Sequence, residues 1–122
     1  MLSESRMLEM HERLSSGRRG RFSVEQLVEA LSPSGHAALG WPEAGRIEVG
    51  ALCDLVGVRL DSLRTSGSLA PQIPLVASAS DVDTVVVGGR TVVEDGRHLP
   101  MRASGGVPRA LSTAISRAWG EA

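Results

Sequence analysis

The residues of this chain that could do chemistry are few and scattered. The three histidines, His11, His36 and His98, lie 25 and 62 residues apart, and the one cysteine is Cys53. A local metal site needs several ligands at short spacing, as in His-x-His or His-Glu-x-x-His, and neither pattern occurs. We therefore predict no metal ligands in this chain and a structural role for each histidine.

Two further features allow a catalytic or a structural interpretation. Asp54 opens the segment DLVGV, where a catalytic carboxylate is one interpretation and an aspartate that ends a turn by hydrogen-bonding the backbone is the commoner one. The run Arg18-Arg19-Gly20-Arg21 could bind a phosphate or carboxylate, but a solvated loop between helices is favoured. Gly88-Gly89 matches no phosphate-binding pattern. The prediction is that no catalytic, substrate-binding or metal-binding residue is present.

Composition indicates one small globular unit. The chain has 122 residues, of which 42% are hydrophobic and 22% charged, with a net charge of -1. Its aromatic residues are only Phe22, Trp41 and Trp119, so the predicted core is thin. Because the charge is small and spread along the chain, nucleic acid is not an expected partner.

The single cysteine and the N-terminus indicate the cellular compartment of the protein. Cys53 cannot form an internal disulfide, and its apolar neighbours predict burial, which suits a reducing cytoplasm. The start MLSESRMLEMHERL lacks a basic stretch followed by an apolar core, and no run approaches the roughly 20 apolar residues that span a bilayer. We expect a cytoplasmic, non-secreted protein without a membrane partner.

The first third of the chain has helical signals. Apolar residues at near-helical spacing predict an amphipathic helix over 2–15. Ser23 and Gln26 have the form of a capping box before VEQLVEAL, and Ser32-Pro33 fits an N-cap with proline at the first helical position of PSGHAAL. Gly40 is the expected stop of that helix.

From Gly45 onward the pattern predicts short strands. These are GRIEVG, DLVGVRL, a segment around IPLVASA, and a hairpin over residues 82–98 with Gly88-Gly89 at its tip and an Asp95-Gly96 turn at its end. The valine run 85–87 predicts a strand covered on both faces. Val107, Leu111, Ile115 and Trp119 recur every four residues and predict a last helix.

Two spaced patterns resemble a known superfamily. LGWPEAGRIEVGALCDLVGVRLD holds Leu39-Gly40, Gly45-x-Ile47, Gly50 and Asp54-Leu55-Val56, and DVDTVVVGGRTVVEDGRH follows. In order and separation they resemble the segment after the barrel and the terminal hairpin of amidohydrolase-superfamily enzymes, with Cys53 where alanine is usual. The start SRMLEMHERLSSGRRGRF and the ending V-V-x-D-G-R-H are similar to N-formimino-L-glutamate (formimidoylglutamate) deiminases.

The resemblance implies a mixed α and β fold. Residues 1–44 would be helices at the end of a (β/α)8 barrel, residues 45–100 the C-terminal strands and hairpin of a small β-sandwich, and residues 101–122 a tail with the last helix. The resemblance also implies hydrolysis of an amidine C–N bond, with release of ammonia from formiminoglutamate in histidine breakdown. In such enzymes a divalent metal, zinc foremost, activates water.

The family's metal ligands cannot be carried over to this sequence. They are an H-x-H on the first barrel strand, histidines on the fifth and sixth and an aspartate on the eighth, and all would precede Met1. We therefore predict that this chain alone is inactive and holds no cofactor.

Two classes of function stay open. The chain is either the C-terminal portion of a metal-dependent deiminase, as a truncated product, a split subunit or a relic, or an autonomous binding or interaction module that reuses the fold. A fragment of another amidohydrolase-type deaminase is a further alternative. In the first case its unpaired sheet edge and apolar stripes, including Leu2, Met7 and Leu14, predict a partner: the missing barrel portion, or a second copy in a family-like homodimer.

Overall fold

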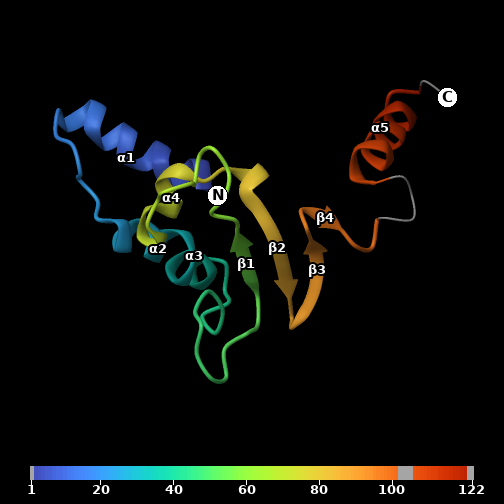
Figure 1. Ribbon diagram of the computed structural model, residues 1–122, viewed down its shortest axis with the longest axis horizontal. Coiled ribbons are helices and arrows are strands. Elements are labelled where there is room, and N and C mark those ends of the chain that lie inside the picture. Colours follow the sequence, from blue (N-terminus) through green and yellow to red (C-terminus); the bar gives the residue numbers. More distant parts are fainter. Residues whose placement is uncertain (1, 102–105, 121–122) are drawn as a thin grey trace.

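The fold is mixed, with helices first and a small antiparallel sheet afterwards (Figure 1). The computed structural model describes residues 2–101 and 106–120. Helices α1 to α4 lie on one side of the sheet in Figure 1, and α5 lies beyond its other edge. Within the described residues, no helix combines the length and the apolarity that a membrane span requires.

The first two helices lie where the sequence predicts them. Helix α1 spans Leu2–Ser16 and α2 spans Val24–Leu31. At the start of α2 the Ser23 side chain accepts a hydrogen bond from the Gln26 N–H at 3.3 Å. In return, the Gln26 side chain accepts one from the Ser23 N–H at 2.9 Å. This reciprocal pair satisfies backbone donors that a helix start leaves free, and it confirms the capping box.

Helix α3, Pro33–Ala38, begins with proline at its first position as predicted, but Ser32 does not cap it through its side chain. The Ser32 hydroxyl instead donates to the Gly45 carbonyl at 2.9 Å, which ties the start of α3 to the following loop. Gly40, with a φ of +87°, follows the end of the helix.

The strand predicted for GRIEVG is absent, and residues 45–50 form a bent loop instead. Gly45 and Gly50 have φ values of +79° and +93°, which a β-strand does not use. The Ala51 N–H donates to the Glu48 carbonyl at 3.2 Å, so the backbone turns where the sequence predicted an extended segment.

Four strands form one antiparallel sheet in the order β1-β2-β3-β4. Val85 lies opposite Val93 and Val86 opposite Thr91, with a register shift between the two pairs. On the other side of β2, Val56 lies opposite Val85. The strands are β1 Leu55–Val58, β2 Val82–Val87, β3 Arg90–Glu94 and β4 Arg97–His98.

The two predicted turns of the hairpin are confirmed. Gly88 and Gly89 join β2 to β3 with φ values of +54° and +76°, the pair of positive angles that a two-residue hairpin turn requires. Asp95 and Gly96, at +49° and +67°, join β3 to β4 in the same way. Aspartate tolerates this region better than most residues because its short polar side chain can hydrogen-bond the nearby backbone.

The prediction of a strand around IPLVASA is also wrong. Residues Ala70–Gln72 form a 3₁₀ turn η1, Ile73–Val76 form a one-turn helix α4, and Ala79–Asp81 form a second 3₁₀ turn η2. Pro74 lies in the first turn of α4, where the missing N–H of proline costs nothing. The Ala77 N–H closes this turn on the Ile73 carbonyl at 2.9 Å.

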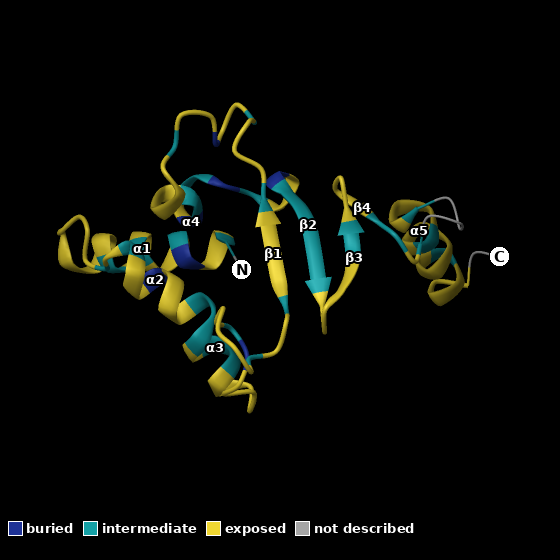
Figure 2. Cartoon of the chain, turned by 60° about the horizontal axis from the view of Figure 1, so that its bottom comes forward, coloured by how far each residue is buried: buried dark blue, intermediate teal, exposed yellow. Residues whose placement is uncertain are grey.

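The buried core is small. Its fully buried apolar residues among the described ones are Leu27, Ala44 and Ala77. In Figure 2 the fully buried positions are isolated and most of the chain is exposed. The valines of β2 are half-buried or exposed, so the predicted cover on both faces of this strand is not seen. Helix α2 packs on α3, α1 packs on α2 and α4, and β2 packs between β1 and β3.

The last helix, α5, spans Val107–Ala118 and confirms the prediction from the four-residue spacing. Its apolar stripe is largely solvent-exposed, and Leu111 is 57% exposed. The stripe consists of Val107, Leu111, Ile115 and Trp119.

Candidate functional site

The histidines and the cysteine do not converge. His11 is exposed on α1, and the His36 Nδ1 lies 2.7 Å from the Ser32 carbonyl, which gives that ring a structural contact. His98 lies in β4 opposite Val93, and its buried Nδ1 has no hydrogen-bond partner in the described part of the chain. Cys53 is exposed, contrary to the predicted burial, because it lies before β1 on the uncovered edge of the sheet.

The described residues do not fit a catalytic metal. In residues 2–101 and 106–120, no three histidine, cysteine, aspartate or glutamate side chains gather into a group that could hold an ion. A hydrolytic zinc needs three protein ligands and an open position for water. No chemical step through a metal can therefore be assigned to these residues.

Asp54 has the structural role that the sequence favours, at longer range than expected. Its Oδ1 accepts a hydrogen bond from the Gly88 N–H at 2.6 Å, across 34 residues of sequence. The neighbouring Gly89 N–H donates to the Cys53 carbonyl at 2.9 Å. Both donors of the hairpin turn are thus satisfied by the residues that lead into β1, and the carboxylate is committed to this backbone contact.

The arginine-rich loop is organised by Glu9, a contact that no local sequence pattern predicts. The Glu9 carboxylate on α1 accepts hydrogen bonds from the backbone N–H groups of Gly20, Arg21 and Phe22, at 2.8, 3.1 and 2.9 Å. The Phe22 N–H is the main cause that lowers the pKa of Glu9, with Arg21 and Gly20 adding to it. The anion-binding backbone of this loop is therefore filled by the protein's own carboxylate.

The strongest charged cluster joins Arg64 to Asp81. The Arg64 guanidinium donates to both carboxylate oxygens of Asp81, at 2.9 and 3.0 Å, and also to the Ser80 hydroxyl at 2.6 Å. The Ser78 N–H adds a bond to Asp81 Oδ2 at 2.8 Å. The Asp81 side chain is 1% exposed, whereas that of Arg64 is 50% exposed.

This cluster acts as a clamp and not as an acid or base. The Arg64 guanidinium, followed by Ser62 and the Ser78 backbone, holds the pKa of Asp81 far below its usual range. A carboxylate with so low a pKa is a weak general base near neutral pH. Asp81 closes η2 directly before β2, so the clamp fixes the entry of the chain into the sheet. In the sequence, this contact could have been predicted from Ser78-x-x-Asp81, which has the form of a capping box.

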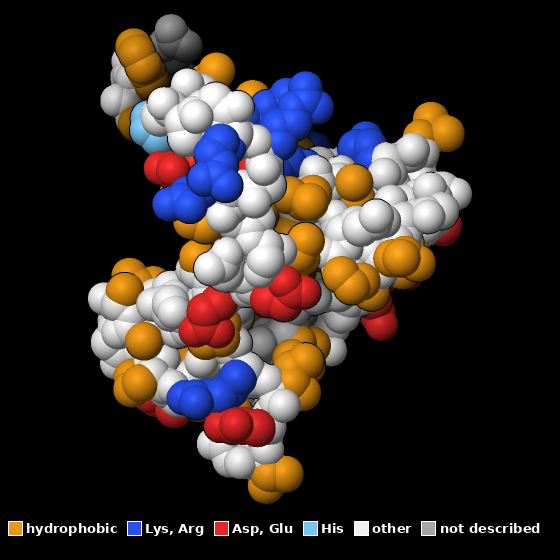
Figure 3. All heavy atoms as spheres, turned by 90° about the vertical axis from the view of Figure 1, so that its left-hand side faces the viewer, with side chains coloured by type: hydrophobic (Ala, Val, Ile, Leu, Met, Phe, Trp, Pro, Cys, Tyr) orange, Lys and Arg blue, Asp and Glu red, His pale blue; other side chains and the backbone are white. Residues whose placement is uncertain are grey.

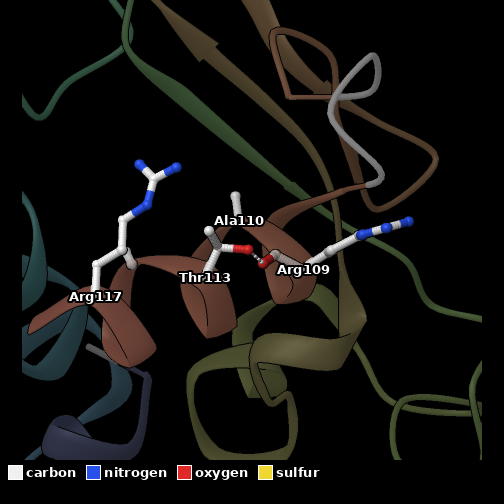
Figure 4. A pocket seen from close by; sticks show the side chains of 5 residues that line it. Arg109, Ala110, Thr113 and Arg117 are labelled. Atoms are coloured by element: carbon white, nitrogen blue, oxygen red, sulfur yellow. Dashed lines mark hydrogen bonds between the residues drawn. The ribbon is translucent and has the colours of Figure 1, made fainter. Parts of the chain in front are cut away.

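A surface hollow lies along α5 (Figure 4). All of its lining residues come from one side of that helix, and the Thr113 hydroxyl already donates to the Arg109 carbonyl at 3.0 Å. In Figure 4 the Arg109 and Arg117 side chains extend away from each other. Among residues 2–101 and 106–120, no second element lines the hollow, so these residues do not give it the converging polar groups of a binding site. It is lined by Arg109, Ala110, Thr113, Ala114 and Arg117.

Comparison with known proteins relates this chain to one enzyme family. The sequence model of the amidohydrolase family matches residues 1–92. A 5-methylthioadenosine/S-adenosylhomocysteine deaminase of Natronomonas pharaonis is 33% identical over 127 residues, which cover 99% of this chain and 29% of that protein. This chain thus spans less than a third of the length of that relative.

Solved structures show the same arrangement of elements. An adenosine deaminase from Xanthomonas campestris with bound zinc matches 99% of this chain and 27% of its own, with a TM-score of 0.81 and 23% identity. An atrazine chlorohydrolase from Arthrobacter aurescens complexed with zinc matches 81% of this chain and 23% of its own, with a TM-score of 0.70 and 23% identity. At these identities the likeness concerns the fold.

Proposed function

This chain belongs to the amidohydrolase family, and from that premise we propose that it is the C-terminal portion of a metal-dependent hydrolase acting on an amidine C–N bond, a formimidoylglutamate deiminase. The reaction adds water to the amidine carbon and releases ammonia. The chain would supply the helices at the end of the barrel and the C-terminal strands of the small β-sandwich. The metal ligands and the substrate-binding residues would lie on the barrel.

The main evidence for a structural role is that polar side chains of the described residues already hold the fold together. Asp54, Glu9 and Asp81 are each committed to hydrogen bonds that hold turns, a loop or the sheet entry. These bonds give the three carboxylates a structural use, and we propose that the groups that act on the substrate lie on the barrel.

The deiminase specificity has its support in sequence pattern. The stretch Arg6-x-Leu8-Glu9 and the ending V-V-x-D-G-R-H are similar to that branch. In the structure Arg6 and Glu9 make backbone contacts, Arg6 to the Ala77 carbonyl at 2.8 Å and Glu9 to the arginine-rich loop. In the deiminase branch these two residues would thus stabilise the fold and would not contact the substrate.

A second candidate, deamination of an aminopurine nucleoside, is favoured by a separate observation. The Natronomonas and Xanthomonas deaminases each match 99% of this chain, a share that takes in α5. The atrazine chlorohydrolase matches 81%. Both candidates hydrolyse a C–N bond at an amidine-type carbon and release ammonia, so they differ in substrate and not in reaction class.

The test begins with the reading frame upstream of this chain. We expect it to encode a barrel with an H-x-H motif, either continuous with this chain or separate from it. The barrel and this chain, expressed together, should release ammonia from formimidoylglutamate, and the barrel alone should be inactive or insoluble. Turnover of adenosine or 5′-methylthioadenosine, with none of formimidoylglutamate, would establish the second candidate. An upstream region without barrel motifs would favour an autonomous module.

A further inference from the structure

We infer that the tip of the loop before β1, residues 46–50, is a preformed docking surface for the barrel portion, whether that portion is continuous with this chain or on a separate polypeptide, and this partner rests on the proposed function. Ile47 is 90% exposed and Val49 is fully exposed. These two apolar side chains are held in water close together. Burying them in an interface would stabilise the complex through the hydrophobic effect.

The loop is held firmly at its base, so the exposure of its tip is built into the fold. Ala44 is buried, and the Leu52 N–H donates to the Glu43 carbonyl at 3.2 Å, which closes the loop. The Ser32 hydroxyl donates to the Gly45 carbonyl from the start of α3. A surface that is already ordered loses little conformational entropy when it binds.

The tip also offers polar groups that suit an interface. Arg46 and Glu48 form an ion pair at 3.3 Å beside the two apolar side chains, which gives the surface a charged rim. Among the described residues, the backbone N–H and C=O of Ile47 have no hydrogen-bond partner. A partner that covers Ile47 must therefore bring a donor and an acceptor of its own, as an adjoining backbone segment would.

The barrel-bearing polypeptide is favoured over a second copy of this chain. The family match includes the loop, and the two deaminase relatives are more than three times as long as the part that this chain covers. In contrast, a stable dimer buries about 1,200 Å² or more, which a tip of two apolar side chains cannot supply by pairing with itself. Figure 1 shows the loop projecting beyond the end of β1, and Figure 3 shows apolar side chains at the surface on that same lower end of the molecule.

The experiment measures hydrogen exchange at the Ile47 and Val49 amides and the affinity of three variants for the barrel-bearing polypeptide from the upstream frame. Both amides should exchange rapidly in this chain alone and slowly in the complex. Ile47→Arg and Val49→Arg should each weaken binding about tenfold or more. Leu63→Arg, at a fully exposed residue that follows β1 and so lies at its other end, should bind like the natural chain. Circular dichroism confirms that each variant is folded.

Each other outcome has a definite meaning. Binding with unchanged exchange at both amides, or equal loss in Leu63→Arg, would overturn the docking surface and leave the proposed function standing. Protection that rises with concentration in the chain alone, with dimers in light scattering, would assign the surface to a second copy. If the barrel does not bind at all, the proposed function fails and the inference fails with it.

Discussion

The carboxylate of Asp54 lies 2.6 Å from the backbone nitrogen of Gly88, and this contact joins the entry of β1 to the tip of the β2–β3 hairpin. The hairpin turn is held from outside, by the residue that directly precedes β1, a strand that pairs with β2 and not with β3. The turn and the edge strand therefore stabilise each other.

Removal of this contact should destabilise the hairpin. Asp54→Ala leaves the Gly88 N–H without its acceptor, and we expect the free energy of unfolding to fall by about 1 kcal/mol. Asp61→Ala is the matched control, because Asp61 forms only an exposed ion pair with Arg59, and such pairs contribute little to stability. Urea denaturation of both variants checks this, and equal midpoints for the two would contradict it.

The loss of stability on substitution in the hairpin turn should depend on backbone conformation alone. A Cβ added at Gly89 would meet no atom within 4 Å, so any cost comes from its φ of +76°. Gly89→Val should cost about 1 to 3 kcal/mol. Gly89→Asn should cost clearly less, because asparagine tolerates the left-handed region. The thermal midpoints of the two variants decide it, and a Val variant as stable as the Asn variant would refute the turn geometry.

Gly45 should be far less replaceable than Gly50, although both have positive φ. A Cβ at Gly45 would lie 2.7 Å from the Ser32 carbonyl oxygen and from His36 Nδ1, whereas a Cβ at Gly50 meets open space. Gly50→Ala should cost about 1 kcal/mol from strain alone. Gly45→Ala should cost more, since the base of the loop must move. Urea titration gives both values, and an equal cost would mean that α3 and the loop are not in contact.

The Arg64–Asp81 clamp should make stability depend on acid pH. The pKa of Asp81 is lowered from its ordinary value of 3.8, so the folded state favours the charged carboxylate. This contribution is fully present above the ordinary pKa and is lost as the pH falls below it. Asp81→Asn should have a lower melting temperature at pH 7 and a flatter decline on acidification. A natural chain and a variant that decline in parallel would argue against the clamp.

The purified chain should bind no stoichiometric zinc. The described residues form no group of three candidate ligands, and an isolated histidine or thiol binds zinc weakly. Elemental analysis after dialysis against zinc checks this. One tightly held ion per chain, lost when two of the three histidines are replaced, would overturn the prediction.

The elements with local signals were predictable from the sequence, and those that depend on distant contacts were not. The capping box of Ser23 and the glycines of the hairpin turn act within a few residues, so their patterns carry the structure. GRIEVG reads as a strand by its alternation, yet its shape is set by Gly45 packing against α3. In IPLVASA, Pro74 at the start of a turn outweighs the β-branched neighbours.

The polar contacts show the same division. The type of contact made by Asp54 was predictable, because aspartate next to a turn bonds to backbone, but Gly88 as its donor was not. The contacts of Glu9 and Arg64 have no local sequence signal, because their partners lie 11 to 17 residues away and only the folded chain brings them together. Cys53 was expected to be buried because its neighbours are apolar, but the sheet leaves that edge uncovered.

The contact of Arg6 with the Ala77 carbonyl also has a consequence for the order of events during synthesis. The two residues are 71 positions apart, so the first helix leaves the ribosome long before the segment that its guanidinium grips. The β2–β3 hairpin, by contrast, forms between neighbouring segments and closes a short loop. Helix α1 therefore cannot complete its packing against α4 until the segment that carries Ala77 has also been made.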